Sequence, residues 1–86
     1  MARVAGARLL TVYSRTYCHL CDDLLAALRT LQGRFVFDIE VVDVDSDAAL
    51  EARYGELVPV VEAEGRELGH YFMDEAAVTA YLMTVR

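Results

Sequence analysis

Two cysteines, Cys18 and Cys21, are the residues of this chain whose type and spacing best suit chemistry. If a helix begins at the first of them, the second sulfur lies one helical turn further on. A thiol at a helix N-terminus faces unpaired backbone N–H groups and the positive end of the helix dipole, and both favour the thiolate. Such placement can lower a cysteine pKa from about 8.5 to about 3.5–7.5. We therefore expect Cys18 to be the nucleophile and the less exposed Cys21 to be the resolving thiol.

Charged neighbours on both sides of the pair act on the same equilibrium. Arg15 and a protonated His19 would favour a thiolate at Cys18, whereas Asp22 and Asp23 would oppose it. Sequence alone does not rank these effects. Because the helix N-terminus acts on the first cysteine in any case, the expectation is a pKa for Cys18 below that of a free thiol.

Two other interpretations of the C-x-x-C pair are open. A structural zinc ion needs about four ligands, and the only further soft ligands are His19, between the cysteines, and the distant His70. The cysteines could also be unreactive core residues that are close by coincidence. A strand-to-helix position in a reducing compartment instead favours redox chemistry, without a bound metal.

The elements around the pair can be read from hydrophobic periodicity. Residues 9–13 form a short, apolar, β-prone run, and a helical stripe follows from Cys18 to a stop signal at Gly33. The stripe consists of four leucines, Leu20, Leu24, Leu28 and Leu31. The pattern places the cysteines between a buried strand and an amphipathic helix.

The rest of the chain continues as alternating elements. Apolar residues alternate along residues 35–41, which indicates a strand with Val41 on its apolar face. A short helix over 48–54 then ends at Gly55 in the left-handed conformation. Residues 59–63 and 66–68 form a hairpin around Glu64-Gly65. Asp74 caps a last helix whose apolar residues are Val78, Tyr81, Leu82 and Val85.

The predicted order βαβαββα determines the architecture. The first strand, helix and strand give a parallel pair joined by a right-handed crossover, and the later hairpin is antiparallel. We expect an α/β fold in which a four-stranded mixed sheet is flanked by helices that bury both of its faces. With 86 residues, of which 56% are hydrophobic, the chain is one domain over residues 1–86.

Charge and composition exclude several classes of partner. A net charge of −6 argues against nucleic-acid binding and against an anionic membrane surface, and no apolar run reaches the roughly 20 residues of a membrane span. Residues 1–34 hold five arginines against two aspartates, whereas residues 35–86 hold three arginines against twelve carboxylates. The acidic part is either a solvated surface with no partner, or the counterpart of an arginine-bearing end that attracts an anionic substrate.

The cellular setting follows from the N-terminal residues and the cysteine count. The first residues lack the apolar stretch of a signal peptide, so we expect a cytoplasmic protein, whose thiols stay reduced. Two cysteines are too few for a disulfide scaffold, and a bridge across so short a loop adds little stability. We expect a monomer in which the pair is reactive.

The segment from Tyr13 to Cys21 (YSRTYCHLC) closes the first strand, and Val58-Pro59 opens the third. This combination resembles the glutaredoxin branch of the thioredoxin superfamily, and most closely the short bacterial glutaredoxin-like proteins that carry C-H-L-C followed by acidic residues. Those proteins also share a D-x-D turn, here residues 43–45, and a Tyr-Gly before V-P-V, here Tyr54-Gly55. The resemblance extends over nearly the whole chain.

The resemblance implies a thioredoxin-like fold and further site residues. The Val58–Pro59 peptide bond would be cis and lie beside Cys18, with the backbone of Val58 pairing with an extended substrate. Arg15 matches the position of a basic residue for a glutathione carboxylate, and Tyr17 matches the aromatic residue before the nucleophile. Glutathione is thus a candidate co-substrate, and no bound cofactor is expected.

The sequence departs from glutaredoxins in three places. Leu57 stands where T-V-P would have threonine, and His19 replaces the proline that is common after the first cysteine. Where glutaredoxins hold glutathione with Gly-Gly and an acidic pair, this chain has residues 69–74 (GHYFMD), with one glycine and a bulky apolar cluster. The departure at residues 69–74 puts glutathione binding in doubt, and His19 should leave the loop less rigid. The apolar cluster either packs under the last helix or faces a partner.

The prediction for function is a thiol–disulfide oxidoreductase that reduces protein or low-molecular-weight disulfides through Cys18 and Cys21, with a separate, unidentified reductant. Three alternatives are open: a glutathione-dependent glutaredoxin, an iron–sulfur or metal carrier that uses Cys18, and a non-enzymatic redox-sensing binding module.

Overall fold

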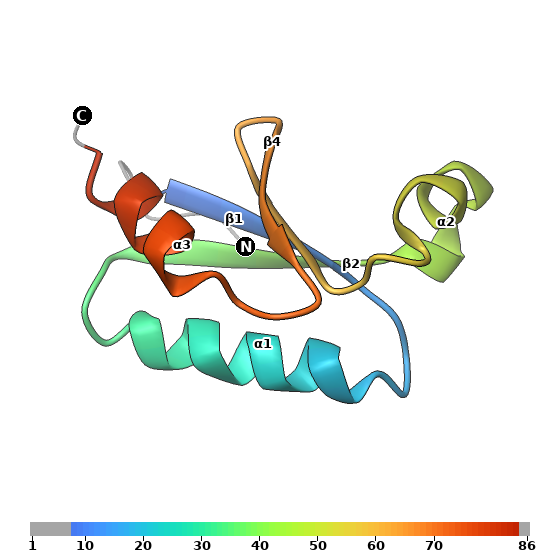
Figure 1. Cartoon of the computed structure of the whole chain (residues 1–86), viewed down its shortest axis with the longest axis horizontal. Coiled ribbons are helices and arrows are strands. Elements are labelled where there is room, and N and C mark those ends of the chain that lie inside the picture. The colour runs from blue at the N-terminus through green and yellow to red at the C-terminus, as the bar shows by residue number, and fades with distance from the viewer. Residues whose placement is uncertain (1–7, 85–86) are drawn as a thin grey trace.

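The computed structural model of this chain describes residues 8–84 and shows the predicted order of helices and strands (Figure 1). The elements are β1 (Arg8–Ser14), α1 (His19–Leu31), β2 (Phe37–Asp43), the 3₁₀ turn η1 (Val44–Ser46), α2 (Ala48–Tyr54), β3 (Val60–Ala63), β4 (Arg66–His70) and α3 (Glu75–Leu82). The turn η1 was not predicted. No helix within residues 8–84 is long and apolar enough to cross a membrane.

The four strands form one mixed sheet in the order β2-β1-β3-β4. β1 and β2 are parallel, as the crossover through α1 requires, and β3 is antiparallel to both β1 and β4. Val60, at the start of β3, pairs with Tyr13 near the end of β1 and with His70 at the end of β4. The chain therefore leaves β1, enters β3 and leaves β4 at one end of the sheet, where the cysteines follow β1.

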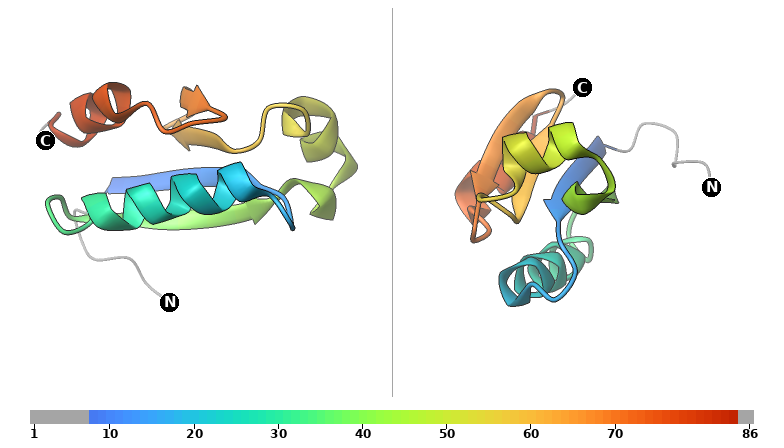
Figure 2. Two further views of the ribbon diagram at one scale, coloured as in Figure 1. Left: turned by 60° about the horizontal axis from the view of Figure 1, so that its bottom comes forward. Right: turned by 90° about the vertical axis from the view of Figure 1, so that its right-hand side faces the viewer.

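The main core lies between one face of the sheet and the helices α1 and α3. α1 runs along β1 and β2 (Figure 2), and three of the four predicted leucines of its stripe are buried. They pack in one cluster with residues of β1, β2, β3 and α3, which are Leu10, Val12, Phe37, Val61, Ala63, Val78 and Tyr81. This cluster fixes the position of the helix that carries both cysteines.

A smaller core lies on the opposite face, under α2. It contains Val44, Tyr54 and Val60, and the rings of Tyr13 and Tyr54 stack with centroids 4.0 Å apart. α2 lies at the end of the sheet rather than across it (Figure 1). Seven residues are too few to cover four strands, so within residues 8–84 the helix covers this face only at the end near the cysteines.

Some expected features differ from the structure. Val41 is 47% exposed, because β2 is an edge strand with no neighbour on its outer side among residues 8–84. β4 extends to His70, beyond the predicted 66–68, and α3 ends at Leu82. Val85, assigned to the last helix, lies outside the described residues.

Two short sequence signals are confirmed. Glu64 and Gly65 form the hairpin turn with φ values of 51° and 79°, the pair of positive angles that such two-residue turns need. The Asp74 side chain accepts a hydrogen bond from the backbone N–H of Ala77 at 3.0 Å and so caps α3.

The tyrosine cluster under α2 predicts how stability depends on alkaline pH. Burial, and then the hydrogen bond that its hydroxyl donates to Glu62 at 2.8 Å, raise the pKa of Tyr54. Since the folded-state pKa lies above the unfolded value, this contribution to stability is complete below about pH 10 and declines above it. Above about pH 10 the unfolding free energy should fall with pH in the unmodified protein. In Tyr54→Phe this fall should be shallower, by up to about 1.4 kcal/mol per pH unit. Urea denaturation from pH 8 to 11 measures it, and equal slopes would contradict the prediction.

Candidate active site

Cys18 is the N-cap residue of α1, as the sequence predicts. Its backbone is extended (φ −116°, ψ 108°), and its Sγ accepts a hydrogen bond from the backbone N–H of Cys21 at 3.2 Å. A sulfur thus takes the place of the side-chain oxygen that usually satisfies the first turn of a helix. The N-terminus of the 13-residue helix therefore faces the sulfur that the sequence assigns as nucleophile.

The two cysteines differ in exposure and are joined to each other. Cys18 is half-buried and Cys21 is 2% exposed, which is the expected order. Their sulfurs form a disulfide, with Cα atoms 5.2 Å apart. Only the first sulfur is in reach of a partner in solution, and the second lies behind it.

The Val58–Pro59 peptide bond is cis, as the resemblance implies, and directly precedes β3. Tyr71 holds this loop at two points. Its backbone N–H donates to the carbonyl of Pro59 at 2.8 Å, and its hydroxyl donates to the carbonyl of Glu56 at 3.0 Å. The residue after β4 thus stabilises the loop that the sequence assigns to substrate pairing.

The apolar cluster before α3, residues 71–73, is partly buried and partly exposed. Met73 packs against the main core, whereas Phe72 is 67% exposed. His70, at the end of β4, pairs through Nδ1 with Glu67 at 2.6 Å. The cluster is therefore partly core and partly an exposed aromatic surface at the end of the sheet that Cys18 also occupies.

Tyr17, directly before the nucleophile, is fully exposed and has φ 60°. A bulky residue in the left-handed region costs on the order of 1–3 kcal/mol, and such strain concentrates at functional sites. The backbone therefore turns this ring into solvent beside Cys18. Its predicted contact with substrate stays a prediction.

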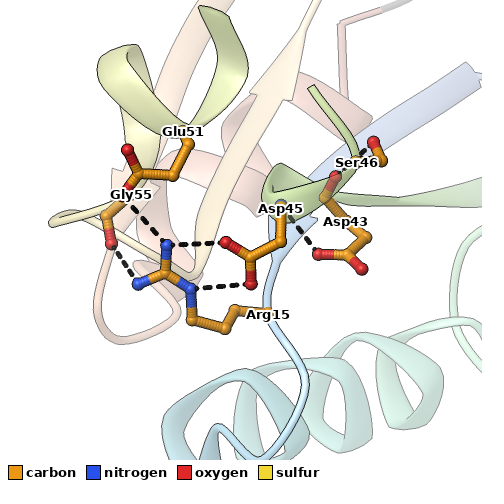
Figure 3. Close-up of polar contacts among 6 residues, drawn as sticks. All are labelled: Arg15, Asp43, Asp45, Ser46, Glu51 and Gly55. Atoms are coloured by element: carbon orange, nitrogen blue, oxygen red, sulfur yellow. Dashed lines mark hydrogen bonds and ion pairs between the residues drawn. The ribbon is translucent and has the colours of Figure 1, made fainter. Parts of the chain in front are cut away.

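Arg15 does not lie free in the loop that carries Cys18 (Figure 3). Its Nε and Nη2 donate to the two carboxylate oxygens of Asp45 at 3.2 and 3.1 Å. Nη2 also donates to Glu51 at 3.2 Å, and Nη1 donates to the carbonyl oxygen of Gly55 at 3.2 Å. The hydrogen bonds with Asp45 and then Glu51 raise the pKa of Arg15, so the guanidinium stays charged.

The main acceptor of Arg15 is itself held in place. The Asp43 side chain accepts from the backbone N–H of Asp45 at 2.9 Å, and Ser46 Oγ donates to the carbonyl of Asp43 at 2.7 Å (Figure 3). Arg15 therefore ties the Cys18 loop to η1, to α2 and to the residue after α2. Sequence reasoning assigned Arg15 to a glutathione carboxylate and did not identify these internal partners.

The backbone conformation of Gly55 differs from the one that the sequence predicts. Its φ of −55° is helical, so the left-handed conformation predicted for it is wrong. Glycine is needed for space instead, because a Cβ here would lie 2.5 Å from both the carbonyl oxygen and the Oε2 of Glu51. The absent side chain leaves room for the Glu51 carboxylate to reach Arg15.

We expect Gly55→Ala to destabilise the protein by about 1–3 kcal/mol, the usual cost of overpacking. The added methyl group must displace both a backbone carbonyl and the Glu51 carboxylate. Urea denaturation measures the loss, with Gly33→Ala as the control, since its Cβ would come no closer than 3.3 Å to another atom. An unchanged midpoint for Gly55→Ala would show that the Glu51 geometry is wrong.

Comparison with known proteins adds to this geometry. The sequence profile of the glutaredoxin-like domain (DUF836) matches residues 9–83. This chain belongs to that family. The glutaredoxin-like match includes every element from β1 to α3 and both cysteines.

Individual relatives agree with the glutaredoxin-like assignment. The solution structure of Protein Ne2328 from Nitrosomonas europaea is 42% identical, with a TM-score of 0.83 over 95% of this chain and 99% of that one. The X-ray structure of protein XcR50 from X. campestris is 43% identical, with a TM-score of 0.67 over 85% and 93%. Uncharacterized protein Rv0508 of Mycobacterium tuberculosis is 32% identical over 72 residues, 78% of this chain and 74% of that protein.

The structure also bears on where a metal could bind. Within residues 8–84, no group of three or more His, Cys, Asp and Glu side chains is arranged to hold a metal ion. The fold is thioredoxin-like, with the C-x-x-C disulfide at the start of α1.

Proposed function

We propose that this chain is a thiol–disulfide oxidoreductase in which Cys18 is the nucleophile and Cys21 the resolving thiol. One observation carries the proposal: Cys18 caps α1, accepts the N–H of Cys21 and is joined to the buried sulfur of Cys21. A thiolate at this place is stabilised by the helix N-terminus, and its partner for a disulfide is already in position.

The reaction proceeds by two exchanges at sulfur. The Cys18 thiolate attacks one sulfur of the substrate disulfide, whose S–S bond breaks, and the other substrate sulfur leaves as a thiolate that takes a proton from water. Cys21 then loses its proton and attacks the Cys18 sulfur of the mixed disulfide, which releases the second substrate thiol. The Cys18–Cys21 pair is oxidised by two electrons, and the substrate disulfide is reduced by two.

Two neighbours of the pair are suited to bind the substrate. The backbone of Val58, before the cis peptide bond, precedes a strand at the same end of the sheet and can pair with an extended segment. Tyr17 places a fully exposed aromatic ring next to Cys18. Protein and low-molecular-weight disulfides both fit this arrangement, and a separate thiol must return the pair to the dithiol.

The rate of Cys18 alkylation against pH tests the proposal. In Cys21→Ser, Cys18 is the only thiol, so the rate of reaction with iodoacetamide reports its ionisation. We expect a midpoint at least one pH unit below the value of about 8.5 for a free thiol. A midpoint at or above 8.5, or reduced wild-type protein that fails to reduce insulin disulfides, would overturn the proposal.

A further inference from the structure

The guanidinium of Arg15 has no free edge for a carboxylate ligand. A carboxylate is best held by two parallel N–H groups of an arginine. The edge formed by Nε and Nη2 is paired with both oxygens of Asp45. The edge formed by Nη1 and Nη2 donates to Gly55 and to Glu51. Of five N–H groups, one on Nη1 is left.

This arrangement also gives a net negative charge to a cluster tied to the loop that carries Cys18. Arg15 carries one positive charge, and Asp45 and Glu51 together carry two negative ones. Both carboxylates are about half exposed, with side-chain exposures of 49% and 52%, so they act on ions in solution. The α carbons of Arg15 and Cys18 are three residues, and hence at most about 11 Å, apart. That distance is close to the Debye length of about 8 Å at physiological ionic strength.

We propose that Arg15 is a positioning residue, and that its cluster with Asp45 and Glu51 makes the active site select small thiols by charge. Neutral and cationic thiols reduce the Cys18–Cys21 disulfide in preference to anionic ones, of which glutathione is an example. The inference rests on the proposed oxidoreductase function and specifies the class of its low-molecular-weight reductant.

The charge selection acts on the reduction of the Cys18–Cys21 disulfide to the dithiol. A small thiolate attacks Cys18, the Cys18–Cys21 bond breaks, and the Cys21 sulfur leaves and takes a proton. A second thiolate attacks the small-molecule sulfur of the mixed disulfide and releases Cys18. Two small thiols are oxidised to one disulfide, and the protein gains two electrons. Each attack brings the charge of the thiol to the loop that Arg15 ties to Asp45 and Glu51.

Three thiols of similar size test the charge dependence on the unmodified protein. Cysteamine is cationic, 2-mercaptoethanol is neutral and 3-mercaptopropionate is anionic. Alkylation and mass spectrometry follow the reduction of the oxidised protein, and each rate is divided by the rate of the same thiol with 2-hydroxyethyl disulfide, which removes differences in intrinsic reactivity. A change of two charge units at about 8 Å in water corresponds to about a fivefold ratio of rates.

We expect the normalised rate for cysteamine to exceed that for 3-mercaptopropionate about fivefold at low ionic strength. The ratio should approach one in 0.5 M salt, and this measurement needs no variant. The normalised rate for glutathione should be close to that for 3-mercaptopropionate, the anionic probe. Equal rates, or a faster reaction of the two anionic thiols, would overturn the inference.

Variants assign the effect to the cluster. Replacing both carboxylates, Asp45→Asn with Glu51→Gln, should reduce the preference and accelerate glutathione, because the cluster loses two negative charges while Arg15 keeps its positive charge. Glu75→Gln is the matched control, since this exposed carboxylate pairs with Arg34 beyond the far end of α1. Arg15→Lys should slow all three thiols alike, as expected of a positioning residue, whereas loss confined to the anionic thiols would make Arg15 a ligand and overturn the inference.

The test of charge selection can fail independently of the alkylation test of the oxidoreductase function. If Cys18 alkylates with an ordinary midpoint while the charge order holds, the oxidoreductase proposal fails and the electrostatic one stands. If the midpoint is lowered and the thiols react alike, the oxidoreductase stands and the charge selection fails.

Discussion

Cys18→Ser is expected to lower the rate of disulfide reduction by a factor on the order of 10³ or more, whereas Cys21→Ser should accumulate a mixed disulfide with its substrate. The reason is geometric. Cys18 is the half-buried sulfur that a substrate can reach, and Cys21, 2% exposed, can only react with a sulfur already bound to Cys18. Removal of the first thiol stops the reaction before any covalent step, and removal of the second stops it between the two exchanges.

Mass spectrometry under non-reducing conditions distinguishes these outcomes. The Cys21→Ser protein, incubated with a disulfide-containing protein, should gain the mass of one substrate half, and dithiothreitol should release it. Cys18→Ser is the control for adducts at the other sulfur. Trapping through Cys21 in that control, at the rate seen for Cys18 in the first variant, would reverse the assigned roles. Trapping from a cell extract would then identify both the substrate and the reductant.

Leu28→Ala is expected to reduce the unfolding free energy by about 2–5 kcal/mol, the range for a leucine removed from a well-packed core. Leu28 is 0% exposed, lies in the C-terminal half of α1 and belongs to the main cluster. Small domains have a total stability of about 5–15 kcal/mol, so this loss is a large share of it. Since α1 also presents Cys18, the redox reaction should fail at the same denaturant concentration as the fold.

Urea denaturation of the oxidised proteins, followed by circular dichroism, measures the loss. Arg29→Ala is the matched control, because it adjoins Leu28 on the same helix but is exposed. Its effect should stay within about 0.5 kcal/mol. A change below 1 kcal/mol for Leu28→Ala would mean that α1 is packed less tightly than the cluster indicates.

Local patterns in the sequence predict most of the fold. The apolar run at 9–13 lies inside β1, which extends over Arg8–Ser14, and the helix begins directly after Cys18. The hairpin turn at Glu64-Gly65 and the cap at Asp74 are also signals within a few residues. Such features depend on backbone geometry and neighbouring side chains, so one sequence is enough to predict them.

The features that were missed depend on contacts between distant segments. Arg15 meets Asp45 across 30 residues and Gly55 across 40, and no local pattern predicts such partners. One signal in the sequence could have indicated an acidic partner for Arg15, namely that this arginine stands beside the cysteines in a strongly acidic chain. The exposure of Val41 depends on strand order, and the cis bond at Pro59 was expected only from the family resemblance.

The separation of the core from the end of the sheet has a consequence for evolution. The Cys18 loop and the η1–α2 segment meet at one end of the sheet, together with the loop before β3 and the residues after β4 (Figure 1). The main cluster between the sheet, α1 and α3 is made of other residues. Substitutions at exposed positions of these segments, such as Tyr17 and Phe72, can thus alter substrate preference with little loss of stability, which lets homologues diverge in specificity while they keep one scaffold.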